Sequence, residues 1–198
     1  MLRFIETIKL LNGEFYNLKY HQARIEFTFT KFFGASKAFD IKQELDKIPT
    51  PMVGLFKCRV DYEESIDKII FQPYIIKSIQ SLKLVEANEI SYSFKFENRD
   101  QLKNLYELRK SADDIIIVKD GMITDSSYAN LLFKRGEDWI TPESPLLRGT
   151  MRQKLIDERR VREERILIDD ITKYEKVKLI NSMLGWDGPE AEISKIVF

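Results

Sequence analysis

The chain has 198 residues, and its 43% hydrophobic content is enough for a substantial core in one domain or two small ones. Lys plus Arg and Asp plus Glu each number 32, so the zero net charge gives no general attraction to nucleic acid or to an anionic membrane. With one cysteine, a charged N-terminus unlike a signal peptide and no apolar run of about 18 residues, the chain predicts a cytoplasmic protein with no membrane partner.

The first half of the chain predicts a mixed α/β unit. Asn12-Gly13 lies between two short apolar stretches and is typical of a tight β-hairpin. Apolar residues then follow at helical spacing, and Pro49 and Pro51 end a second short helix. The predicted elements are hairpin strands 3–9 and 14–16, helices 21–33 and 39–48, and strands 53–61 and 68–74.

A change in composition predicts a domain boundary, because polar residues interrupt the apolar pattern between Lys77 and Ser91. We expect a smaller N-terminal α/β domain over residues 1–85 and a C-terminal α/β domain over residues 86–198. The charges from Asp157 to Arg165 are of both signs, which is typical of a solvated helix face. The second domain is predicted to contain helix 100–110, strand 115–118, a hairpin of strands 131–134 and 139–140, helix 150–162, and a strand within 174–181.

Two motifs carry most of the chemistry, KDGMITDSSYAN at 119–130 and TPESPLLRGTMR at 141–152. Asp120-Gly121 predicts a tight hairpin that places Asp125 and its neighbouring hydroxyls at the end of a strand. Gly149-Thr150 starts a helical pattern, where unpaired backbone N–H groups suit a phosphate. The two motifs together predict an anion site around one acid, with a phosphorylated small molecule as its ligand.

Other catalytic sets find little support in this sequence. With one histidine and one cysteine, no metal site is expected. No GxGxxG, P-loop or GxSxG motif occurs, so the usual routes to nucleotide binding and to α/β-hydrolase chemistry are unsupported.

Five motifs occur in an order that resembles one enzyme family. They are HQAR at 21–24, FKFENR at 94–99, DGMITDSSYANLLF at 120–133, TPESPLLRGTMRQKLI at 141–156 and KLINSM at 178–183. With these five motifs in this order, the chain resembles the fold-type IV pyridoxal-phosphate enzymes. These are the class IV aminotransferases, which include branched-chain and D-amino-acid aminotransferases and 4-amino-4-deoxychorismate lyase. The resemblance implies a shortened two-domain D-amino-acid-aminotransferase-like α/β fold with pyridoxal 5′-phosphate in the cleft between domains. It also implies a homodimer.

The resemblance assigns a role to each candidate site residue. Lys95 matches the family's Schiff-base lysine, which forms the covalent link to the cofactor and then moves the α-proton. Asp125 matches the acid opposite the pyridine nitrogen. Arg24 resembles the arginine that binds the phosphate. The remaining phosphate contacts implied are the N–H groups of Thr150 and Met151 after Gly149, and the hydroxyl of Ser182.

Each of these residues also has a plain structural interpretation. Lys95 suits a solvated strand, Arg24 the polar face of its helix, and Asp125 a turn next to Ser126 and Ser127. The two serines are expected to shape that turn rather than to bind the phosphate.

Two departures from the family pattern bear on function. The acid is usually a glutamate, so Asp125 is one methylene shorter. The chain is also short in its first domain, where the family builds its substrate pocket. We expect an aminotransferase that moves an amino group from a small amino acid to a keto acid. The alternatives are a 4-amino-4-deoxychorismate lyase, favoured by FKFENR and releasing pyruvate to give 4-aminobenzoate, and a catalytically reduced cofactor-binding or structural module.

Overall fold

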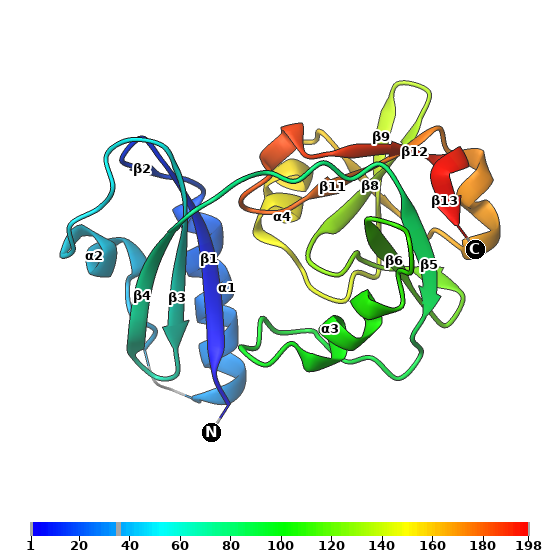
Figure 1. Ribbon diagram of the computed structural model, residues 1–198. Helices are drawn as coiled ribbons and strands as arrows, with labels where there is room; N and C mark the ends of the chain where they lie inside the picture. Colours follow the sequence, from blue (N-terminus) through cyan, green and yellow to red (C-terminus); the bar gives the residue numbers. More distant parts are fainter. Residues whose placement is uncertain (1, 35–36, 198) are drawn as a thin grey trace. The chain divides into compact units, whose positions relative to one another are not determined.

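The computed structural model describes residues 2–34 and 37–197, and the chain forms two compact units (Figure 1). Unit 1 comprises Met1–Ile76 and Phe94–Asn98, and unit 2 comprises Lys77–Ser93 and Arg99–Phe198. The chain therefore passes into unit 2, returns briefly to unit 1, and enters unit 2 again. The single boundary expected at residue 85 differs from this division, because strand β5 (Leu82–Glu86) pairs with β6 (Asp114–Lys119) inside unit 2.

Unit 1 is an antiparallel sheet covered by a helix. Its strand order is β2-β1-β3-β4, and α1 runs along one face of the sheet (Figure 1). The predicted opening hairpin is confirmed, since Asn12 and Gly13 have φ values of 49° and 83°, the left-handed pair that a type I′ turn requires. The elements are β1 Phe4–Leu11, β2 Glu14–Phe15, α1 Leu18–Phe32, α2 Ile41–Asp46, β3 Leu55–Tyr62 and β4 Ile66–Pro73.

The core of unit 1 is aromatic and lies between α1 and the sheet. Ile25 and Phe29 on α1 contact side chains of β1 and β3, and the ring of Phe29 stacks on that of Tyr62 at 6.5 Å between centroids. The segment 94–98 joins this core, because Phe96 pairs with Phe4 in an isolated antiparallel bridge. This pairing holds the segment that contains Lys95 against the first strand.

Unit 2 contains two sheets that share one core. The five-stranded sheet has the order β10-β9-β8-β11-β12, and the four-stranded sheet has the order β13-β5-β6-β7. Side chains of β6, such as Ile116, pack with Leu131 of β8 and Leu179 of β11 between the sheets. The remaining elements of unit 2 are α3 Asp100–Glu107, β7 Met122–Ile123, β8 Asn130–Arg135, β9 Asp138–Pro142, α4 Thr150–Asp157, β10 Arg162–Glu164, η1 Ile168–Lys173, β11 Lys176–Ile180, η2 Gly185–Asp187, β12 Glu190–Glu192, η3 Ile193–Lys195 and β13 Ile196–Val197.

Helix α4 packs on the other face of the five-stranded sheet. Met151 and Leu155 contact Leu132 and Ile180, the strand residues whose side chains point away from the shared core. This packing fixes the first turn of α4 beside the ends of β8 and β11.

The sequence analysis of unit 2 missed one strand and extended one helix too far. Strand β5 was not predicted, because its five residues lie among Ser and Asn and are ordered by pairing with β6 and β13, which are distant in sequence. The helix predicted over 150–162 ends at Asp157. Its C-terminus turns at Arg159, where φ is 55°, and the charged stretch beyond it forms β10, paired parallel to β9.

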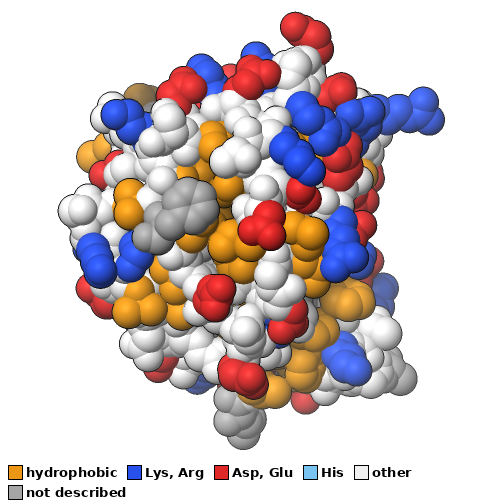
Figure 2. Space-filling view, turned by 90° about the vertical axis from the view of Figure 1, so that its right-hand side faces the viewer, with side chains coloured by type: hydrophobic (Ala, Val, Ile, Leu, Met, Phe, Trp, Pro, Cys, Tyr) orange, Lys and Arg blue, Asp and Glu red, His pale blue; other side chains and the backbone are white. Residues whose placement is uncertain are grey.

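The surface carries charges of both signs. Figure 2 shows one face on which Lys and Arg, Asp and Glu, and hydrophobic side chains lie interspersed, as the equal numbers of basic and acidic residues predict. Within residues 2–34 and 37–197, no helix combines the length and the apolar character that a membrane span requires.

Candidate active site

The acidic loop of unit 2 begins at a hairpin. Asp120 and Gly121 have φ values of 52° and 74°, which confirms the tight turn predicted for this dipeptide, and β6 pairs with β7 across it. The chain then turns again between Asp125 and Asn130, which form an isolated bridge. Ser126 Oγ accepts hydrogen bonds from the N–H groups of Tyr128 at 3.3 Å and Ala129 at 3.0 Å. This serine therefore shapes the turn, as predicted.

The carboxylate of Asp125 is buried and held by two donors. Asn130 Nδ2 donates to Oδ1 at 2.7 Å, and the backbone N–H of Leu147 donates to Oδ2 at 2.9 Å. Burial raises the pKa of Asp125 to about 6, even though both hydrogen bonds act in the opposite direction. Such a carboxylate gains from a cationic N–H partner, because that partner would offset the cost of burying its charge.

The loop before α4 is joined to this acid. Asn130 Nδ2 also donates to the carbonyl of Leu147 at 2.8 Å, so one amide holds both the acid and the loop. Gly149 is the N-cap of α4, and a Cβ at this position would lie 2.0 Å from Asn130 Oδ1. Only glycine fits against Asn130. The cap makes no side-chain hydrogen bond, and Thr150 and Met151 are buried in the first turn of a helix whose N-terminus favours an anion.

The end of β11 adds a third loop. Asn181 Oδ1 accepts from the N–H groups of Met183 and Leu184, both at 2.9 Å, and this turn carries Ser182. Asn181 Nδ2 donates to the carbonyl of Tyr128 at 3.4 Å, in the turn that follows Asp125. Because Ile180 pairs with Asn130 in the sheet, the loops that carry Asp125, Gly149 and Ser182 meet at one end of the five-stranded sheet.

Unit 1 contributes a separate buried cluster. Glu6 on β1 is completely buried, and its carboxylate accepts from Arg24 Nε at 2.8 Å and from Arg24 Nη2 at 2.5 Å. His21 Nδ1 lies 2.6 Å from Glu6 Oε2. Burial alone would raise the pKa of Glu6, but the charge and hydrogen bonds of Arg24, with those of His21, lower it to about 2. The carboxylate is therefore ionised across the ordinary range of pH.

Lys95 lies beside this cluster on segment 94–98. Its carbonyl accepts the N–H of Ile5 at 2.9 Å, which places it next to Glu6 along β1. Its side chain is half-buried. The pKa of His21 is lowered mainly by burial; Glu6 opposes this shift, and the charges of Arg24 and Lys95 add to it.

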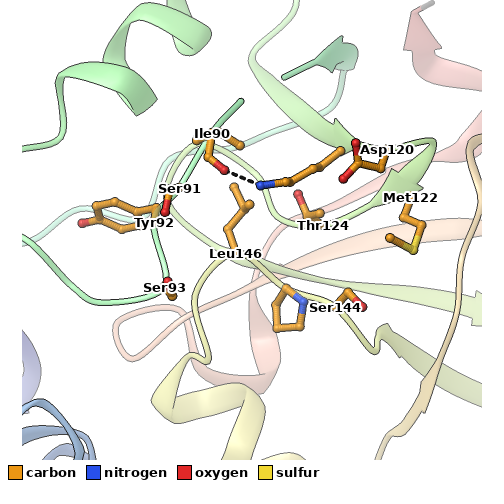
Figure 3. Close-up of a pocket in the computed structure, with 11 residues that line it drawn as sticks. Ile90, Ser91, Tyr92, Ser93, Asp120, Met122, Thr124, Ser144 and Leu146 are labelled. Carbon is orange, nitrogen blue, oxygen red and sulfur yellow. Dashed lines mark hydrogen bonds between the residues drawn. The ribbon is translucent and has the colours of Figure 1, made fainter. Parts of the chain in front are cut away.

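A small pocket of unit 2 adjoins the acidic loop. It has a volume of about 290 Å³, and Thr124, Ser91, Ser144 and Lys119 are among the residues that line it (Figure 3). Lys119 Nζ donates to the carbonyl of Ile90 at 2.7 Å and so closes one side of the pocket. Thr124 lines this pocket and Asp125 does not, as expected where consecutive residues of an extended chain point to opposite sides.

Comparisons with known proteins agree with these features. The family model for class IV aminotransferases ("Amino-transferase class IV") matches residues 97–187. A functionally uncharacterised protein of Haemophilus influenzae is 36% identical over 188 residues, covering 93% of this chain and all of that protein. The chain belongs to the class IV aminotransferase family. Its members are the pyridoxal-phosphate enzymes of fold type IV, so the family resemblance and the mixed α/β fold predicted from the sequence are confirmed.

Solved structures of class IV aminotransferase relatives share the fold over most of this chain. One from Haemophilus somnus 129PT, provisionally named a 4-amino-4-deoxychorismate lyase, is 36% identical, with a TM-score of 0.85 over 93% of this chain and 98% of that chain. Another from Mesorhizobium loti, provisionally named an amino-acid aminotransferase, is 20% identical, with a TM-score of 0.79 over the whole of both chains. An aminotransferase from Brucella abortus bound to pyridoxal phosphate is 14% identical, with a TM-score of 0.71 over 98% of this chain and 81% of that chain.

The side chains present suit the cofactor of this family. A buried acid with a raised pKa suits a protonated ring nitrogen, and the glycine-capped start of α4 suits a phosphate. Unit 2 brings together the loops of Asp125, Gly149 to Met151 and Ser182, while Arg24 and Lys95 belong to unit 1. Sequence reasoning missed Glu6 and Asn181, and the motif at 119–130 contains Asn130 without showing which groups it bonds to. The HQAR motif offered a signal for Glu6, because His21 and Arg24 lie one helical turn apart and together favour a carboxylate partner.

Proposed function

We propose that this class IV aminotransferase relative binds pyridoxal 5′-phosphate and transfers an amino group from a small amino acid to a keto acid. The observation that carries the proposal is the buried carboxylate of Asp125, held by Asn130 and tied to the loop that leads into α4. The cofactor, when bound, supplies an electron sink for the pair of electrons left when a proton leaves the substrate α-carbon.

The role proposed for Asp125 is to hold a proton on the ring nitrogen. Its carboxylate lies in a buried setting where a cationic N–H is the favoured partner. The side chain of Asp125 is one methylene shorter than that of the glutamate usual in the family. The hydrogen bonds from Asn130 and Leu147 hold its carboxylate in one position.

The roles proposed for the phosphate contacts fall to both units. Arg24 would donate charge-assisted hydrogen bonds, and the N–H groups of Thr150 and Met151 would donate from the start of α4. Gly149 keeps this start open, and Ser182 would add a hydroxyl from the end of β11.

The role proposed for Lys95 is nucleophile and proton carrier. Its amine would form the covalent link to the cofactor, and an incoming amino acid would displace it. The displaced amine would then be the base that takes the proton from the substrate α-carbon and the acid that returns it on the far side of the substrate nitrogen.

Borohydride trapping tests these assignments directly. Holoenzyme treated with borohydride and digested should carry the cofactor on Lys95, identified by peptide mass spectrometry. Lys95→Ala should carry none, and Lys103→Ala, an exposed lysine of α3, should behave like the wild type. Attachment to another lysine would overturn the site. A protein that binds no cofactor would be a catalytically reduced module.

The 4-amino-4-deoxychorismate lyase reaction is the second candidate, favoured by the 36% identical structure provisionally named for that activity. Supplying aminodeoxychorismate without an amino acceptor separates the two reactions. Release of pyruvate and 4-aminobenzoate would establish the lyase. Conversion of an amino acid to its keto acid, with the cofactor left in its amine form, would establish transamination instead.

The homodimer expected from the family is also part of the proposal. Light scattering after size-exclusion chromatography tests it, since a dimer would have twice the 23.4 kDa mass of the chain.

A further inference from the structure

A buried carboxylate on β1 lies outside the roles proposed so far. Glu6 is fully buried in unit 1, where an isolated charge would be strongly unfavourable. The surrounding side chains compensate it, since Arg24 on α1 donates to both of its oxygens. Apolar residues of similar size could stabilise a small unit as well as such a pair does, so stability alone does not account for it.

The geometry of the pair fixes the guanidinium group. Arg24 uses Nε and Nη2, at 2.8 Å and 2.5 Å, so one edge of the planar fork faces Glu6. A guanidinium has five N–H donors, and these two bonds set the plane in which the others lie. The side chain of Arg24 is 12% exposed while that of Glu6 is wholly buried, so the arginine is where this cluster reaches the surface of unit 1.

His21 supports the carboxylate from its other side. Its ring is fully buried, and Nδ1 lies 2.6 Å from Glu6 Oε2. Glu6 is ionised, so Nδ1 carries the hydrogen and donates it. Among the described residues, Nε2 finds no hydrogen-bond partner. The imidazole therefore makes one directed contact, which orients the glutamate.

We infer that Glu6 is a positioning residue, supported by His21, that orients Arg24 toward the phosphate of the cofactor. The inference rests on the proposed function, because it requires Arg24 to be a phosphate ligand. An arginine held in place before binding loses less side-chain freedom when the anion arrives. A purely structural pair would stabilise unit 1 without distinguishing a phosphorylated ligand from an unphosphorylated one.

The test compares pyridoxal 5′-phosphate with pyridoxal, which lacks the phosphate and still has the aldehyde that reacts with lysine. Dissociation constants of both ligands are measured by absorbance titration for the wild type, Glu6→Gln and His21→Asn. We expect Glu6→Gln to weaken binding of pyridoxal 5′-phosphate by about tenfold, as for loss of one charged hydrogen bond, and to leave pyridoxal nearly unchanged. We expect a smaller loss of the same selectivity in His21→Asn.

Asp61→Asn is the matched control. Asp61 lies on β3 of the same sheet and accepts from Arg59 Nε at 2.6 Å, so this variant also removes a carboxylate from an arginine. It should not alter the preference for the phosphorylated ligand.

The outcomes separate the inference from the proposed function. Equal weakening of both ligands in Glu6→Gln, or no weakening of either, would overturn the positioning role. If Glu6→Gln does not fold, His21→Asn decides, because it leaves the pair of Glu6 and Arg24 in place. A wild-type protein that binds neither ligand would contradict the proposed function itself.

Discussion

Asn130 Nδ2 donates to Asp125 Oδ1 at 2.7 Å and, from the same nitrogen, to the carbonyl of Leu147 at 2.8 Å. One amide thus connects the acidic turn to the loop that leads into α4. Leu147 completes the connection, because its own N–H donates to Asp125 Oδ2 at 2.9 Å. The acid and the start of α4 are therefore held as one piece within unit 2.

Removing the amide of Asn130 should loosen this connection. In Asn130→Ala, Asp125 loses one donor inside a buried site, and we expect the free energy of unfolding to fall by about 1–3 kcal/mol. Urea denaturation of the cofactor-free protein measures this change. Asn88→Ala is the control, since Asn88 accepts one bond from the N–H of Asp120 at an exposed turn and should cost less than about 1 kcal/mol. Equal losses in both variants would contradict the role given to Asn130.

Gly149→Ala should damage the site through a collision with Asn130. A Cβ would lie 2.0 Å from Asn130 Oδ1, so the amide must move and release Asp125. We expect a loss of about 1–3 kcal/mol in stability. The double variant Gly149→Ala with Asn130→Ala should lose less than the sum of the two single variants, because the colliding atom is gone. Denaturation curves of the four proteins measure this coupling, and simple additivity would rule out the collision.

The stability of the cofactor-free protein should depend on Asp125 between about pH 4 and pH 6. Burial raises the folded-state pKa to about 6 from the ordinary 3.8, so the unfolded chain loses its proton first as the pH rises. The folded state is thereby penalised, and the penalty is complete above about pH 6, where it reaches about 3 kcal/mol. Asp125→Asn lacks it, so its stability relative to the wild type should be greater at pH 7 than at pH 4.

Thermal unfolding of both proteins across this range provides the measurement. A difference that stays constant with pH would show that Asp125 titrates normally in the folded protein. A bound cation next to the carboxylate would shift the transition to lower pH, since it favours the ionised form.

The hairpins and the acidic loop could be predicted because their signals are local. Asn12-Gly13 and Asp120-Gly121 favour a left-handed backbone through their own residue types, and both turns occur as expected. Asp125 and Gly149 were identified by motif, although their connection through Asn130 depends on folding. A sequence pattern shows which groups are available and does not show which side chains share a hydrogen bond.

The missed features depend on partners distant in the chain. Strand β5 has a weak local pattern and is ordered by β6, about 30 residues later. The end of α4 at Asp157 is set by the left-handed turn at Arg159, a residue type that carries no stop signal. The sequence alone gives Glu6 no partner, because Arg24 and His21 contact it only after α1 packs against β1.

Glu6 should give the opposite pH dependence from Asp125. Burial raises the folded-state pKa of Glu6, but Arg24 and His21 outweigh this effect and lower the pKa to about 2, below the ordinary 4.5. The pair therefore contributes stability that is fully present above about pH 4.5 and is lost as the pH falls toward 2. Glu6→Gln removes one partner of a buried pair, and we expect it to cost about 3–5 kcal/mol at pH 7. The cost should shrink steadily below pH 4.5.

Thermal denaturation of Glu6→Gln and the wild type at pH 7 and pH 3.5 measures this dependence. Asp61→Asn provides the comparison, because Asp61 pairs on the same sheet with Arg59, whose side chain is 30% exposed, and solvent screening makes such an ion pair weaker than a fully buried one. A cost of Glu6→Gln that is the same at both pH values would mean that the carboxylate is not ionised against Arg24 in the folded protein. In that case Arg24 would not be held by charge, and its orientation would have to come from packing on α1 alone.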